Sequence, residues 1–119
     1  MIKGLLIRTD GIIENIEFED TLENLQGYVG GLIEFVSVTD DIDMICNDEG
    51  KLIGLDFNLN ASLLYHPDDF IVGDVIVVRN DQNGAIISLT DDDKKKVLKL
   101  MNERRDSYTK RWIDKYFES

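Results

Sequence analysis

The first 90 residues alternate short apolar runs with turn-forming residues, a pattern typical of proteins built from hairpins. Leu5–Ile7 and Ile12–Phe18 are two such runs, and Asp10-Gly11 lies between them. Asp-Gly favours a type I′ turn, because both central positions of that turn need a positive φ. The pattern therefore predicts an N-terminal hairpin.

A second group of strands is predicted in the middle of the chain. Residues 32–38 and 42–46 are β-rich runs joined through Asp40-Asp41. A turn at 47–50 is expected to continue into a strand at Lys51–Ile53. These segments would add a second and a third antiparallel pair to the sheet.

The run from Phe70 to Arg79 is the clearest strand. It holds four consecutive β-branched residues, which indicates burial on both faces. Before it, residues 55–65 are expected to form a loop and then a short helix. After it, Asn83-Gly84 predicts a type I′ turn into a strand at 85–89.

Two helices have clear start signals, and the first of them also has a stop signal. Asp20 with Glu23 has the spacing of a capping box, and the helix that follows is expected to end at Gly30. Thr90 with Asp93 has the same spacing and opens a C-terminal helix that runs to near the terminus.

Together these elements predict an α+β fold. A mainly antiparallel sheet of six or seven short strands carries one short helix after the first hairpin, and a long C-terminal helix covers one face. Residues 1–90 are expected to form the acidic α+β domain. Residues 91–119 are expected to form a basic, aromatic helix that packs on this domain or on a second subunit.

Charge is distributed unevenly along the 119 residues. The whole chain has 13 basic and 24 acidic residues, a formal charge of −11, but residues 1–93 hold 4 basic and 20 acidic ones. An acidic body of this kind repels nucleic acid phosphates, so a basic protein is the expected partner. Two alternatives remain open: the acids serve only solubility, or they mimic the phosphates of nucleic acid.

The usual catalytic signatures are missing from the sequence. There is no nucleophile with a base, no histidine pair, no calcium loop and no glycine-rich phosphate loop, so neither an enzyme nor a metal or cofactor site is expected. His66, before Pro67, is interpreted as an exposed turn residue, and Cys46 as a small buried apolar side chain. One cysteine, no signal peptide pattern and no apolar run of membrane length predict a cytoplasmic protein.

Basic and aromatic residues interleave in the last segment. This composition suits base stacking with phosphate pairing. The same segment also has residues that recur on one helical face: Val97, Met101, Tyr108, Trp112 and Tyr116. The second pattern favours packing on the sheet or on another copy of the chain. A homodimer is therefore expected, with Arg104, Arg105 and Arg111 at the rim of the contact.

Three segments resemble a known family when read in order: Leu22–Glu34, Asn47–Leu55 and Ile71–Val78. They are similar to the small phage and mobile-element domain catalogued as domain of unknown function 3846, over residues 1–90. The resemblance implies a viral or plasmid accessory protein and no known activity. Around Asn58, where the family carries prolines and a basic pair linked to phosphate binding, this chain has Asp56-Phe57 and Leu59-Asn60.

We therefore expect a non-enzymatic, phage-type accessory protein of the host cell cytoplasm, with no membrane association. It would bind and inhibit a host protein, such as a basic or DNA-binding defence factor, through its acidic surface. The alternative is a binder that sequesters a small molecule or nucleotide-like signal between subunits. The candidate binding residues are Asp40, Asp41, Asp43, Asn58, Arg104, Arg105, Tyr108, Arg111 and Trp112.

Overall fold

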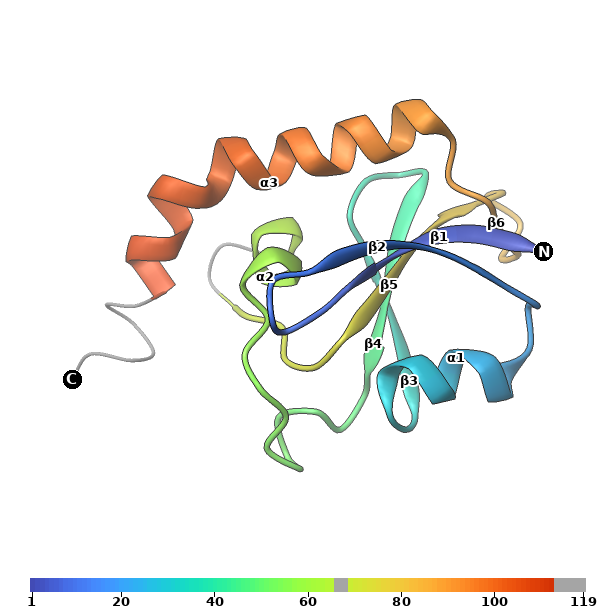
Figure 1. Ribbon diagram of the computed structural model, residues 1–119, viewed down its shortest axis with the longest axis horizontal. Helices are drawn as coiled ribbons and strands as arrows, with labels where there is room; N and C mark the ends of the chain where they lie inside the picture. The colour runs from blue at the N-terminus through green and yellow to red at the C-terminus, as the bar shows by residue number, and fades with distance from the viewer. Residues whose placement is uncertain (66–68, 113–119) are drawn as a thin grey trace.

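A computed structural model describes the backbone of residues 1–65 and 69–112, and the side chains within these ranges up to residue 105. Six antiparallel strands form one sheet in the order β2-β1-β5-β4-β3, with β6 also paired to β5 (Figure 1). The strands are β1 Ile2–Ile7, β2 Ile13–Phe18, β3 Ile33–Ser37, β4 Ile42–Asn47, β5 Val75–Asn80 and β6 Ile86–Ile87. The predicted α+β class with an antiparallel sheet is confirmed.

Helices cover both faces of this sheet. Helix α1 (Leu22–Val29) packs on one face, and α2 (Leu59–Leu64) and α3 (Asp91–Trp112) pack on the other (Figure 1). The first four residues of β5 alternate between the two apolar clusters, and none of them is exposed. Burial of this strand on both faces is therefore confirmed.

The long C-terminal helix belongs to the same core. Val97 and Met101 are buried beneath it in the cluster that also holds α2. As predicted, Thr90 and Asp93 form a capping box: the Thr90 N–H donates to the Asp93 carboxylate (2.9 Å), and the Asp93 N–H donates to the Thr90 hydroxyl (3.0 Å). The Asp93 carboxylate also pairs with Arg79 of β5 at 2.8 Å, which ties the start of α3 to the sheet.

The ends of α1 are partly as predicted. Its N-cap is Thr21, whose hydroxyl accepts the Asn24 N–H at 3.1 Å, so the predicted capping box at Asp20 and Glu23 is wrong by one residue. Thr21 has a short polar side chain that accepts an N–H of the first helical turn, which is the role predicted for Asp20. Gly30 ends the helix as predicted, with φ +80°.

Neither predicted type I′ turn forms. In the first hairpin only Gly11 has a positive φ, and its N–H donates to the Arg8 carbonyl at 3.1 Å, so the loop is one residue longer than a type I′ turn requires. In the second, Gln82 and Gly84 have positive φ but Asn83 does not. The Asp81 carboxylate organises this longer loop by accepting the N–H groups of Asn83 and Ala85.

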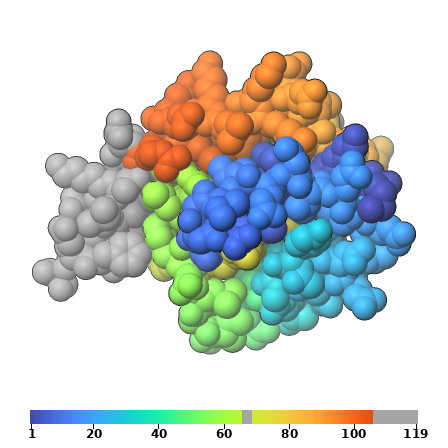
Figure 2. All heavy atoms as spheres, in the orientation of Figure 1, coloured from blue at the N-terminus to red at the C-terminus, as the bar shows by residue number. Residues whose placement is uncertain are grey.

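The predicted strand at Lys51–Ile53 is also wrong. These residues form exposed turns, and Leu52 is 83% exposed. In the space-filling view the segment after β4 (green) projects from the surface (Figure 2). The reason is topological: β3 and β5 already occupy both sides of β4, so no edge is left for a third partner.

The strand predicted at 70–79 begins only at Val75. Gly73 has φ +80°, which interrupts extended pairing, and only a single bridge joins Phe57 to Val72 before it. The short helix predicted within 55–65 is confirmed as α2. No helix within the described ranges is long and apolar enough to cross a membrane.

Candidate functional site

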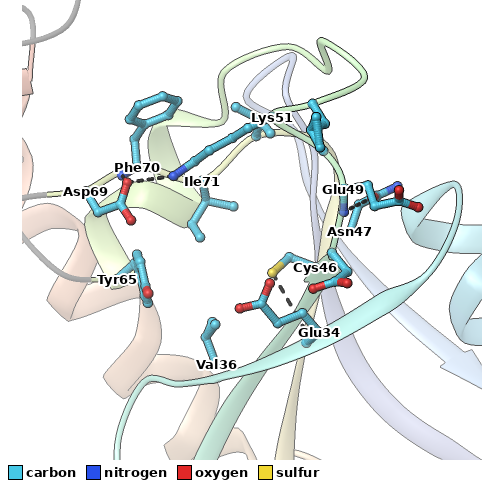
Figure 3. Close-up of a pocket in the computed structure, with 14 residues that line it drawn as sticks. Glu34, Val36, Cys46, Asn47, Glu49, Lys51, Tyr65, Asp69, Phe70 and Ile71 are labelled. Atoms are coloured by element: carbon cyan, nitrogen blue, oxygen red, sulfur yellow. Dashed lines mark hydrogen bonds and ion pairs between the residues drawn. The ribbon is translucent and has the colours of Figure 1, made fainter.

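A hollow of about 200 Å³ opens on the α2 side of the sheet, beside the outer strand β3 (Figure 3). Strands β3 and β4 form its floor, and the segments after β4 and after α2 form its walls. We call it the acidic pocket. Its lining residues are Glu34, Val36, Cys46, Asn47, Asp48, Glu49, Gly50, Lys51, Leu52, Tyr65, Asp69, Phe70, Ile71 and Val72.

The floor follows from strand alternation. In β3, Glu34 and Val36 share the face that turns toward the pocket, and Cys46 of β4 lies directly opposite Glu34. At the end of β4 the buried Asn47 holds the turn in place. Its amide donates to the Val29 carbonyl (3.1 Å) and its side-chain oxygen accepts the Glu49 N–H (2.8 Å).

The opposite wall already holds a cation. The Lys51 ammonium lies 2.6 Å from an Asp69 carboxylate oxygen and 4.4 Å from the centroid of the Phe70 ring. Carboxylate contact together with an aromatic face is a favourable environment for ammonium and guanidinium groups. Lys51 is about half exposed, so this contact is open to solvent.

Carboxylates dominate the rest of the pocket. Among the described residues of the lining, Glu34, Asp48, Glu49 and Asp69 are acidic, and Lys51 is the one basic residue. Partial burial, followed by the neighbouring Asp48 charge and hydrogen bond, raises the pKa of Glu34. Negatively charged side chains therefore outnumber positively charged ones in the described lining.

The thiol of Cys46, which lines the pocket, is not an activated nucleophile. Burial, and then the charges of Glu34 and Asp48, raise the pKa of Cys46 to about 11. Its thiol is protonated at neutral pH and donates weakly to the Glu34 carbonyl at 3.7 Å. Burial of Cys46 confirms the interpretation from sequence. The described lining, rich in carboxylates, is a favourable environment for a positively charged group.

The predicted acidic cluster lies elsewhere. Asp40, Asp41 and Asp43 occupy the β3–β4 turn and the start of β4, and none of them lines the pocket. The Asp41 carboxylate faces Arg79 at 3.6 Å and accepts the side-chain amide of Gln82 at 2.7 Å. This turn is therefore tied to the β5–β6 loop.

Asn58 is fully buried. It caps α2 by accepting the Ala61 N–H at 3.1 Å, and its amide donates to the Ile7 carbonyl (3.0 Å) and the Gly73 carbonyl (2.8 Å). A ligand would have to displace these bonds to reach it.

The two described arginines of the tail contact α2 through neutral groups. Arg104 donates to the Leu63 carbonyl at 3.0 Å, and Arg105 donates to the Asn60 side-chain oxygen at 3.1 Å. They hold α3 on the body of the protein. The remaining candidates, Tyr108, Arg111 and Trp112, lie outside the described side chains, as does His66.

All four basic residues of positions 1–93 are engaged in ion pairs: Lys3 with Glu17, Arg8 with Asp10 and Glu14, Lys51 with Asp69, and Arg79 with Asp41 and Asp93. The acids in excess of these pairs leave the body strongly negative. Within the described ranges no group of three or more His, Cys, Asp or Glu side chains could hold a metal ion.

The sequence interpretation missed the pocket because its walls come from separate segments. The one available signal was Glu34, the only charged residue in the run at 32–38. A charge at such a position either blunts a sheet edge or faces a site.

Comparison with known proteins supports a family assignment. The family model described as domain of unknown function (DUF3846) matches residues 2–102. The match extends beyond the sheet into α3, further than the resemblance over residues 1–90 predicted. Neither a search of curated proteins nor a search of solved structures returns a match.

Proposed function

The chain belongs to the family described as domain of unknown function 3846, and from this premise we propose that it is a non-enzymatic protein-binding domain that recognises a basic partner. The recognition element is the acidic pocket, which takes up a lysine or arginine side chain of the partner. The surrounding acidic body orients the approach, since complementary charge acts mainly on orientation and association rate.

One observation carries this proposal. The contact of Lys51 with Asp69 and Phe70 is an internal example of the interaction that a partner's side chain would make. Glu34, Asp48 and Glu49 add three carboxylates within the same lining. A second cation, or one that replaces Lys51, would therefore find both a carboxylate and an aromatic face.

We extend the proposal to a class of partner. A partner that offers lysine or arginine side chains to the acidic pocket has a basic surface, which is typical of DNA-binding proteins. A domain that covers this surface would inhibit such a protein by competing with nucleic acid. Such an inhibitor, directed at a host defence factor, is the phage-type role expected from the resemblance. A nucleotide-like ligand is less favoured, because Arg104 and Arg105 are bonded to α2 and the pocket is lined by carboxylates.

The test uses a four-arginine peptide with both ends capped, titrated calorimetrically into the full chain at low and moderate salt. We expect binding that weakens with salt. Asp48→Asn with Glu49→Gln should lower the affinity about tenfold, because two charge-assisted contacts are lost.

The matched control is Asp20→Asn with Glu23→Gln, which removes the same charge near the start of α1, outside the pocket. Its affinity should stay within about twofold of the wild type. Equal weakening in both variants would mean that the peptide senses only net charge. No binding of the peptide at low salt would also refute the proposal.

A further inference from the structure

We infer that the partner's basic segment binds in an extended conformation, as an additional strand along the outer edge of β3, with alternate side chains entering the acidic pocket. This inference rests on the proposed function and specifies the form of the partner. It follows from the backbone of β3, from the side chains on its two faces, and from the charge beside it.

The backbone of β3 has a free edge. The Asp48 N–H donates to the Leu32 carbonyl, and the Val38 N–H donates to the Ile42 carbonyl, each at 2.8 Å. Since hydrogen-bonded pairs recur every second residue in an antiparallel ladder, Glu34 and Val36 face β4 with their backbone groups.

The backbone N–H and C=O groups of Ile33, Phe35 and Ser37 consequently point away from the sheet. In the described part of the chain no strand lies on that side, because β3 ends the strand order. Six hydrogen-bonding groups in regular spacing are therefore available to an incoming strand.

The two faces of this edge differ in chemistry. On the pocket face, β3 presents Glu34 and Val36. On the other face, Phe35 is 49% exposed. Side chains of an added strand alternate between the same two faces. The segment that fits would alternate basic and apolar residues, with the basic ones over the pocket.

Charge decides between this occupant and a second copy of the chain. Antiparallel pairing of two β3 strands would bring two Glu34 side chains and two acidic pockets close together. Like charges on facing strands are destabilising, whereas opposite charges stabilise the pair. The same Glu34 that blunts the edge against indiscriminate pairing thus admits a basic strand.

The other outer strand lacks this combination. β2 also ends the strand order, but it contributes no residue to the acidic pocket. Its Asn15 side chain is engaged by the Lys94 ammonium at 2.8 Å, and its Glu14 is paired with Arg8 at 2.9 Å. Strand addition with recognition of basic side chains is therefore specific to β3.

Three capped octapeptides test the inference on the full chain. The first alternates lysine and valine, the second has the same composition in two blocks, and the third is the alternating peptide with every second amide N-methylated. We expect the alternating peptide to bind about tenfold more tightly than the other two, because only it matches both the side-chain alternation and the hydrogen bonds of the edge.

Amide hydrogen exchange gives the second measurement. On addition of the alternating peptide, exchange of the Ile33, Phe35 and Ser37 amides should slow about tenfold or more. The amides of Glu34 and Val36, which already face β4, should change little. In the free protein, a rise in the protection of the Ile33, Phe35 and Ser37 amides with protein concentration would show pairing between copies of the chain. That result would overturn the inference.

A pair of variants isolates the backbone contribution. Phe35→Pro removes one outward-pointing N–H, and edge strands tolerate proline where the N–H faces solvent. Phe35→Ala removes the side chain alone. We expect Phe35→Pro to bind the alternating peptide about tenfold more weakly than Phe35→Ala. If Phe35→Pro does not fold, the N-methylated peptide supplies the same comparison on the wild type.

The outcomes separate the two proposals. If all three octapeptides bind equally and the edge amides remain unprotected, strand addition is wrong, while uptake of a basic side chain by the pocket stands. If none of them binds and the four-arginine peptide also fails, the proposed function is wrong as well.

Discussion

Replacement of Asn58 by alanine should be among the most destabilising single substitutions in this protein. Its side-chain oxygen caps α2 through the Ala61 N–H, and its amide donates to the carbonyls of Ile7 and Gly73. The residue has no exposed surface, so water cannot replace these bonds. One side chain thereby joins the first strand, the second helix and the approach to the central strand.

The magnitude follows from the three bonds. Loss of an N-cap costs about 1 kcal/mol, and each buried hydrogen bond lost costs roughly 1 kcal/mol, more where a buried carbonyl keeps no other partner. The sum is roughly 3–5 kcal/mol, a large part of the 5–15 kcal/mol by which a typical domain is stable.

Urea denaturation followed by circular dichroism measures this loss in the free energy of unfolding. Thr21→Ala is the matched control, because Thr21 caps α1 through a single exposed hydrogen bond and should cost about 1 kcal/mol. Asn58→Asp keeps the capping acceptor but loses both donors, so it should also be strongly destabilising. If Asn58→Ala costs no more than Thr21→Ala, the two amide bonds contribute nothing net and the reasoning is refuted.

Four further outcomes are expected. Gly30→Val should lower the free energy of unfolding by roughly 1–3 kcal/mol, because φ is +80° and space is open, and Gly30→Asn should cost less; equal losses in thermal melts would contradict this. Cys46, with a pKa of about 11, should react slowly with iodoacetamide at neutral pH until urea unfolds the chain, and fast labelling of the folded protein would argue against its burial. Burial alone would raise the pKa of Asp93, but the hydrogen bonds and the ion pair of this carboxylate lower its pKa below the ordinary 3.8. The stability that the carboxylate contributes is therefore complete above pH 3.8 and is lost as the pH falls through the pKa of the folded state. Asp93→Asn should reduce the loss of stability at acid pH, and an unchanged loss would count against this linkage. We expect sedimentation to find a homodimer at tens of micromolar that Trp112→Ala with Tyr116→Ala makes monomeric, whereas a wild-type monomer would refute a dimer through the tail.

Local signals in the sequence predicted most elements of the fold. The β-branched run at 75–78, the glycine at position 30 and the pair Thr90 and Asp93 each specify their structure through neighbours within a few residues, and each forms as expected. The strand at 51–53 failed for the opposite reason. Its pattern is suitable, but β4 is already paired on both sides, and pairing across the sheet is not encoded in a local pattern.

The candidate site could be predicted less well. Asp40, Asp41 and Asp43 were predicted as binding residues because they are clustered in sequence, yet the pocket gathers Glu34 and Asp69 from positions 35 residues apart. The turn at 47–50 was expected from the sequence, but the hydrogen bonds by which Asn47 holds it, and the closeness of Asp69 to Lys51, join residues that are far apart in the sequence. Net charge led to the proposed class of partner, but it gave no position for the binding site.

The central position of β5 has a consequence for how the sheet is assembled during synthesis. β1 and β4 each have an early partner, β2 and β3, but they are joined to one another only through residues 75–80. At about 5–20 residues per second, a ribosome needs several seconds to pass from β4 to the end of β5. For that time β1 and β4 lack the strand that pairs with their inner edges in the folded sheet, so a chaperone or another nascent chain can reach those edges. A message truncated before codon 75 would leave those edges open permanently, and its product should aggregate.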